Sequence, residues 1–145
     1  MKRDIHYIVV HCTATPPDTT IESIKRYWRE ELHWKNPGYH YIIQRSGKIE
    51  TLLLEEQIAN GVKGYNKISI HISYVGGVDR HDNPVDNRTA EQVQAMITKL
   101  TELKSKYPKA VILGHRDFPA VTKKCPSFDV RQWLKVYAPE FINPA

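Results

Sequence analysis

The chain has 145 residues, a usual length for one domain and enough to bury a core without disulfide or metal support. Hydrophobic residues make up 41% and charged residues 26%, which argues against disordered and fibrous classes. The formal net charge of +5 is compatible with nucleic acid, a lipid surface or an anionic polymer as partner. No run of basic residues is longer than the pair Lys123-Lys124, so most Lys and Arg side chains are expected on a solvated surface.

The first residues lack a typical leader sequence. Their apolar run is only Tyr7-Ile8-Val9-Val10, too short for the core of a signal peptide or for a membrane span. We therefore expect synthesis in the cytoplasm without a signal peptide, and no membrane anchor. Under reducing conditions Cys12 and Cys125 are expected as free thiols or metal ligands, and a disulfide is the less favoured alternative.

A strand and a helix are expected first along the chain. Residues 5–10 are rich in β-branched and aromatic side chains and predict a buried strand that ends at His11. Residues 21–33 carry apolar side chains at helical spacing, which predicts a helix. Thr19 and Glu22 have the spacing of a capping box at its start.

The middle of the chain predicts mainly β-structure. Residues 39–44 and 49–54 are strand-like and are joined by the short Gly-containing turn 45–48, which is typical of a hairpin. Residues 69–75 predict a further strand, and the polar stretch 79–87 predicts a surface loop.

The last third predicts two helices and a strand. A capping box at 89–92 opens an amphipathic helix that ends near Lys106. Residues 110–113 predict a short buried strand with His115 just past its end, and residues 129–137 predict a final helix.

Strands interleaved with helices predict an α/β fold: a single domain over 1–145 with a central mixed β-sheet flanked by helices. The sheet is mixed because the hairpin strands are antiparallel. Reactive groups in such sheets gather where strands end, and both His11 and His115 stand at predicted strand ends.

Three potential metal ligands stand where a sheet could bring them together: His11, His115 and Cys125. Two imidazoles and one thiolate suit a tetrahedral zinc ion and leave its fourth position for a water molecule that can attack a carbonyl. The spacing alone is a weak signal, since no compact ligand motif is present. Structural histidines and a buried thiol are the alternative interpretation.

The sequence around these residues is more specific. In chain order it contains VHCTAT at 10–15, GYHYII at 38–43, KGYN at 63–66, VGG at 75–77, GHRD at 114–117 and CPSFD at 125–129. Together these blocks resemble the N-acetylmuramoyl-L-alanine amidases of the phage-lysozyme type, a family that also includes the peptidoglycan recognition proteins. The resemblance runs from about Tyr7 to Trp133.

The resemblance implies a Zn²⁺ site made of His11, His115 and Cys125, with Tyr39 and Lys123 as catalytic residues. The implied substrate is the peptidoglycan amide bond between N-acetylmuramic acid and L-alanine. Lys123 could stabilise the oxyanion, and Tyr39 could position water or pass a proton to the leaving amine. Without the resemblance, a surface lysine and a half-buried strand tyrosine are the simpler interpretations, and a one-residue shift would replace Lys123 by Lys124.

Four further side chains are assigned weaker roles. His40 is expected on the face opposite Tyr39, as a structural residue, and Cys12 is expected as a small buried hydrophobic side chain. Asp117 could orient a ligand, but a turn cap is favoured. Trp34 is the one tryptophan for which stacking on a sugar is considered.

Two positions depart from the family pattern. Members often carry His where Gly61 stands and Gly where His71 stands. We hypothesise that His71, on a neighbouring strand, fills the cleft position left empty at Gly61.

The preferred function is a zinc-dependent peptidoglycan amidase, endolysin-like and of phage or prophage type, or a cell-wall remodelling enzyme. It is expected to be a monomer that acts on the cell wall after release or export. A non-cleaving peptidoglycan-binding module is the alternative, which the retained Cys125 disfavours. Nucleic acid is not an expected partner because no recognition motif is present; a regulatory protein partner cannot be read from the sequence.

Overall fold

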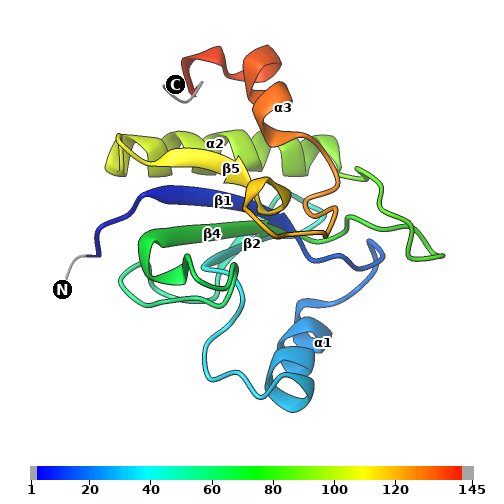
Figure 1. Ribbon diagram of the computed structural model, residues 1–145. Helices are drawn as coiled ribbons and strands as arrows, with labels where there is room; N and C mark the ends of the chain where they lie inside the picture. The colour runs from blue at the N-terminus through cyan, green and yellow to red at the C-terminus, as the bar shows by residue number, and fades with distance from the viewer. Residues whose placement is uncertain (1–2, 142–145) are drawn as a thin grey trace.

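The computed structural model describes residues 3–141, which are built around one five-stranded sheet with the order β3-β2-β4-β1-β5 (Figure 1). The strands are β1 Tyr7–Cys12, β2 Tyr41–Ile43, β3 Ile49–Thr51, β4 Ser69–Tyr74 and β5 Val111–Gly114. β1 runs parallel to β4 and β5, β2 runs parallel to β4, and β3 is antiparallel to β2. The expected mixed sheet and hairpin are therefore confirmed.

Three helices flank this sheet. They are α1 Ile21–Arg26, which continues as the π-helical turn η1 Tyr27–Glu31, then α2 Ala90–Lys106 and α3 Val130–Tyr137. Short 3-10 turns lie at η2 Asn66–Ile68, η3 His115–Asp117 and η4 Pro139–Phe141. α2 and α3 cover one face of the sheet, and α1 lies on the other side (Figure 1).

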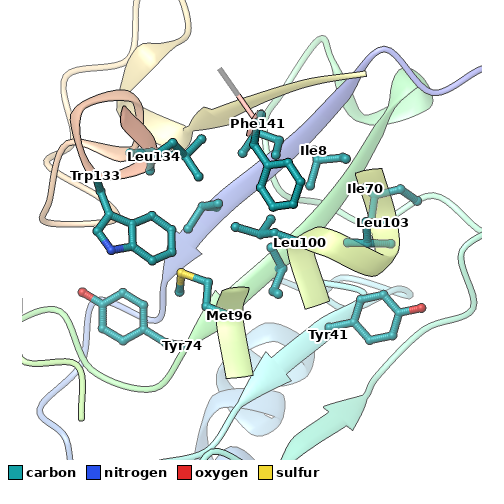
Figure 2. Packing of buried hydrophobic residues seen from close by; sticks show 14 of the residues in the cluster. Ile8, Tyr41, Ile70, Tyr74, Met96, Leu100, Leu103, Trp133, Leu134 and Phe141 are labelled. Atoms are coloured by element: carbon teal, nitrogen blue, oxygen red, sulfur yellow. The ribbon is translucent and has the colours of Figure 1, made fainter. Parts of the chain in front are cut away.

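The main core lies between the sheet and α2. Figure 2 shows Met96, Leu100 and Leu103 of α2 packed against side chains of β1 and β4 such as Ile8 and Ile70. Each fully buried aliphatic side chain contributes about 1.5–3 kcal/mol through its removal from water. Because strand side chains alternate between faces, burying Ile8 on this side directs His11 to the opposite side.

Several expected boundaries were wrong, including those of the hairpin strands expected at 39–44 and 49–54, which span only Tyr41–Ile43 and Ile49–Thr51. β1 continues through His11 to Cys12, because Cys12 still pairs with Tyr74 of β4. The cap of α1 is Thr20 rather than Thr19: its hydroxyl accepts the N–H of Ser23 at 3.2 Å. The helical segment also ends at Glu31, not at residue 33.

The expected capping box of α2, the start of the last helix and the free cysteines agree with the structure. Thr89 and Gln92 form the capping box of α2, and Asp129 caps α3 by accepting the N–H of Gln132 at 3.1 Å. Cys12 and Cys125 are both free thiols. Within residues 3–141, no helix combines the length and apolar composition needed to cross a bilayer.

Candidate functional site

His11, His115 and Cys125 come together at the carboxyl ends of β1 and β5. His11 is the penultimate residue of β1, His115 directly follows β5, and Cys125 lies in the loop before α3. Their ligand atoms all lie within 4.8 Å of one another, and Cys125 Sγ is 4.0 Å from His11 Nδ1. Ligand atoms of a tetrahedral zinc ion lie roughly 3.5 Å apart. This donor set and spacing therefore fit zinc after small side-chain adjustments.

Hydrogen bonds to β1, η3 and Gly77 fix the loop that carries Cys125. The N–H of Cys12 donates to Cys125 Sγ at 3.1 Å, and the N–H of Arg116 donates to the Cys125 carbonyl at 2.9 Å. The Ser127 hydroxyl donates to the carbonyl of Gly77 at 2.7 Å. These bonds hold the thiol beside β1.

The environment of the cluster favours neutral imidazoles. Burial, reinforced by His71 and His115, lowers the pKa of His11 well below its ordinary value. Burial and the charge of Lys123 lower the pKa of His115 to about 4. Burial raises the pKa of the Cys125 thiol well above its ordinary value, so a metal must displace its proton. The two histidines thus hold free lone pairs, the form that binds metal.

Tyr39 lies beside this cluster. Its hydroxyl donates to the Cys12 carbonyl at 3.1 Å, and its ring centre is 5.0 Å from that of His11. Trp28 packs edge-on against the Tyr39 ring at 5.3 Å. Burial raises the pKa of Tyr39 well above its ordinary value, so the hydroxyl keeps its proton.

One cleft of about 650 Å³ is lined by the metal-ligand cluster, Tyr39 and Lys123. Lys123 is part of this lining and Lys124 is not. The aromatic side chains Tyr27, Trp28 and Trp34 line the same cleft. A second hollow of about 670 Å³, lined partly by Trp34 and Lys123, also includes His115. Both hollows have the size of small-molecule or short-peptide sites.

The structure gives each of the four weaker candidate residues a distinct environment. His40 is buried and its Nδ1 accepts the backbone N–H of His71 at 3.0 Å, a structural contact. The expectation that it lies on the face opposite Tyr39 was wrong, because its ring stacks on His71, which contacts His11 beside Tyr39. Cys12 is buried in the main core, as expected. Asp117 caps a turn, since its Oδ2 accepts the N–H of Gly114 at 2.8 Å. Trp34 stacks on Trp28 and lines the cleft.

The region around Gly61 agrees with only part of the sequence hypothesis. A Cβ added to Gly61 would lie 2.2 Å from His71 Nδ1, so the His71 ring does fill the space of a side chain at position 61. His71 is fully buried, however, and it is Gly61 that lines the cleft. The sequence also gave no role to Asn66, whose side chain contacts His71.

Comparison with known proteins adds to this geometry. The family model described as N-acetylmuramoyl-L-alanine amidase matches residues 1–128. The endolysin of Enterobacteria phage K11 is 40% identical over 136 residues, which cover 92% of this chain and 88% of that protein. The endolysin of Escherichia phage T7 is 38% identical over 127 residues, covering 87% and 83%.

Solved structures share the architecture. The Ph2119 endolysin from Thermus scotoductus MAT2119 bacteriophage Ph2119 superimposes with a TM-score of 0.77 at 28% identity, over 99% of this chain and 88% of that one. Human PGRP-IBETAC, solved with glycosamyl muramyl pentapeptide, has a TM-score of 0.76 at 16% identity, over 95% and 86%. The second likeness is one of fold.

Proposed function

Because the chain belongs to the N-acetylmuramoyl-L-alanine amidase family, we propose that it cleaves the amide bond between N-acetylmuramic acid and L-alanine of peptidoglycan with a zinc ion held by His11, His115 and Cys125. Amidase activity follows from the family match and from the endolysins at about 40% identity. The observation that carries the zinc assignment is the convergence of the three ligand atoms within 4.8 Å, on the wall of a cleft.

A bound zinc ion would supply Lewis-acid chemistry, which polarises a carbonyl and acidifies water. The protein's own groups complete the reaction. Lys123 lines the cleft and brings a positive charge that stabilises the oxyanion formed from the scissile carbonyl. Tyr39 keeps its hydroxyl proton and holds it beside the cluster, where it orients the attacking water or protonates the leaving amine.

The cleft is the proposed binding site for the substrate. Trp34 offers an aromatic face for the sugar or the peptide, while the metal ligands stand at the reacting bond. The net charge of +5 favours approach to an anionic cell wall. We therefore assign the chain an endolysin-type role as a single catalytic domain over 1–145, acting as a monomer on the cell wall after release or export.

A non-cleaving peptidoglycan-binding module is the competing function. It needs the cleft but not a complete ligand set, and the thiol of Cys125 is present and held beside His11. The complete set favours the enzyme.

The test is release of stem peptide from purified peptidoglycan by the zinc-loaded protein, with and without a chelator. Cys125→Ser should lose zinc and activity together, whereas Lys123→Ala should keep zinc and lose activity. Lys124→Ala is the matched control and should retain both. Binding without cleavage by the zinc-loaded wild type across a broad pH range would establish the binding module instead.

A further inference from the structure

A continuous hydrogen-bonded path leads from His11 into the interior. His11 Nε2 lies 2.8 Å from His71 Nδ1, and His71 Nε2 lies 3.0 Å from Asn66 Oδ1. The same oxygen accepts the backbone N–H groups of Gly61 at 3.0 Å and Val62 at 2.7 Å. His11 and His71 are 1% and 0% exposed, so bulk water does not compete for these bonds.

The backbone amides determine where the protons lie along this path. An N–H group only donates, so the Asn66 atom that receives two of them must be its oxygen. The third partner of that oxygen, His71 Nε2, must then carry a proton. A neutral His71 therefore has its lone pair on Nδ1, which must accept a proton from His11 Nε2.

The neutral form of His71 follows from its surroundings. Among the described residues, hydrogen bonds join its ring nitrogens to His11 and Asn66, neither of which is a carboxylate. A buried imidazolium without a facing carboxylate costs several kcal/mol, on the order of other unpaired buried charges.

We infer that His71 and Asn66 are positioning residues that hold His11 in its Nε2–H tautomer and direct the lone pair of Nδ1 toward the metal. The role of this arrangement in metal binding rests on the proposed function, but the positions of the protons can be tested without metal. His11 Nδ1 is the nitrogen that lies 4.0 Å from Cys125 Sγ, so the lone pair is on the side of the other ligands. Partners of this kind fix both the tautomer and the orientation of a metal-binding histidine.

Gly61 is a part of the same arrangement. A Cβ at this position would lie 2.2 Å from His71 Nδ1 and 2.4 Å from its Cε1, so a side chain there would displace the ring. The absence of a side chain at Gly61 thus leaves room for His71 while its N–H fixes the Asn66 oxygen. The departure from the family pattern has this steric reason.

The proton arrangement is tested by ¹⁵N NMR of the histidine rings in the full-length chain without metal. The expected spectrum shows His11 protonated on Nε2 and unprotonated on Nδ1. His71→Leu replaces the imidazole by an apolar side chain of similar size that has no hydrogen-bond acceptor. This variant should give a mixture of His11 tautomers. An Nδ1–H tautomer of His11 in the wild type would overturn the inference.

Zinc affinity, measured by competition with a chelator, tests whether His71 positions His11 for metal binding. His71→Leu should raise the zinc Kd about 10- to 100-fold. His71→Asn places an acceptor oxygen near the position of Nδ1 and should restore affinity to within a few-fold. Val9→Ala truncates another fully buried side chain and controls for general destabilisation, so its zinc Kd should stay unchanged.

The outcomes separate the two proposals. Unchanged zinc affinity in folded His71→Leu would overturn the positioning role while leaving the proposed function intact. Failure of the wild type to bind zinc, with His11 still in the Nε2–H tautomer, would overturn the zinc assignment and leave the proton arrangement standing. If His71→Leu does not fold, the wild-type spectrum and the His71→Asn affinity still decide the question.

Discussion

The two faces of the same sheet differ sharply in what they bury. The face under α2 is apolar, with Ile8 and Val10 of β1 in the main core. The opposite face carries most of the buried polar side chains of residues 3–141, namely His11, His40, Ser69, His71 and Ser73. Among the described residues, no buried side-chain nitrogen or oxygen lacks a hydrogen-bond partner. The face under α2 supplies the main apolar core, whereas the opposite face combines smaller apolar clusters with the ligand cluster.

The largest expected effect is on the apolar face. Leu100→Ala should lower the free energy of unfolding by about 2–5 kcal/mol, because a fully buried side chain leaves a cavity against β1 and β4. Zinc affinity of the folded fraction should stay unchanged. Denaturant unfolding measures the loss, with Leu54→Ala, at a side chain that is 58% exposed, as the control. Loss of zinc binding by folded Leu100→Ala would contradict the separation of the two faces.

The opposite behaviour is expected at the cleft. Tyr39→Phe should lower kcat about 100-fold or more, since it removes the hydroxyl proton beside the ligand cluster. Stability should change far less, because the ring still packs on Trp28. Steady-state kinetics on soluble muropeptides measure this effect. Tyr27→Phe, also at the cleft, is the control, and an equal loss there would argue against a specific role for Tyr39.

The polar face should also make stability depend on pH. Burial lowers the pKa of His40 to about 4, whereas an unfolded histidine titrates near 6.5. Between these values the unfolded chain holds more protons, so stability falls as pH decreases from about 6.5 to about 4 and is fully present above 6.5. His40 should contribute up to about 1.4 kcal/mol per pH unit.

Unfolding of the metal-free protein at several pH values tests this dependence. His40→Gln should have a shallower slope of unfolding free energy against pH than the wild type. His33→Asn, at an exposed position, should keep the wild-type slope. Equal slopes for His40→Gln and wild type would show that His40 does not contribute.

The smallest expected effect concerns substrate contact. Trp34→Ala should raise KM about 3- to 10-fold, the size expected for one lost aromatic stacking contact, with kcat nearly unchanged. Trp34→Phe should recover most of the affinity. An unchanged KM for Trp34→Ala would place the sugar elsewhere in the cleft.

Local patterns predicted much of the fold. Alternation, the hairpin turn and the capping box at Thr89 identified the strands and α2 to within a few residues. The end of β1 was missed because pairing of Cys12 with Tyr74 is a long-range contact that no local pattern encodes. The choice of Thr20 over Thr19 as cap was likewise unreadable, since adjacent threonines offer the same chemistry.

The sequence predicted some residues of the candidate site and missed others. His11, His115 and Cys125 were found through the family resemblance, and the structure brings them together; their role as zinc ligands stays a prediction. Asn66 was missed because an Asn after Gly and Tyr is typical of a loop. The alternation of β4 places His71 on one face, but its contact with His11 depends on the parallel register with β1.

The close approach of Gly61 and His71 has an evolutionary consequence. With histidine at both positions the side chains would overlap, whereas glycine at both positions creates no such overlap. An evolutionary change that moves the imidazole from one position to the other should therefore be less disruptive if the intermediate sequence has glycine at both positions. The two positions should change together in related sequences, and each residue's tolerance to substitution should depend on the identity of the other.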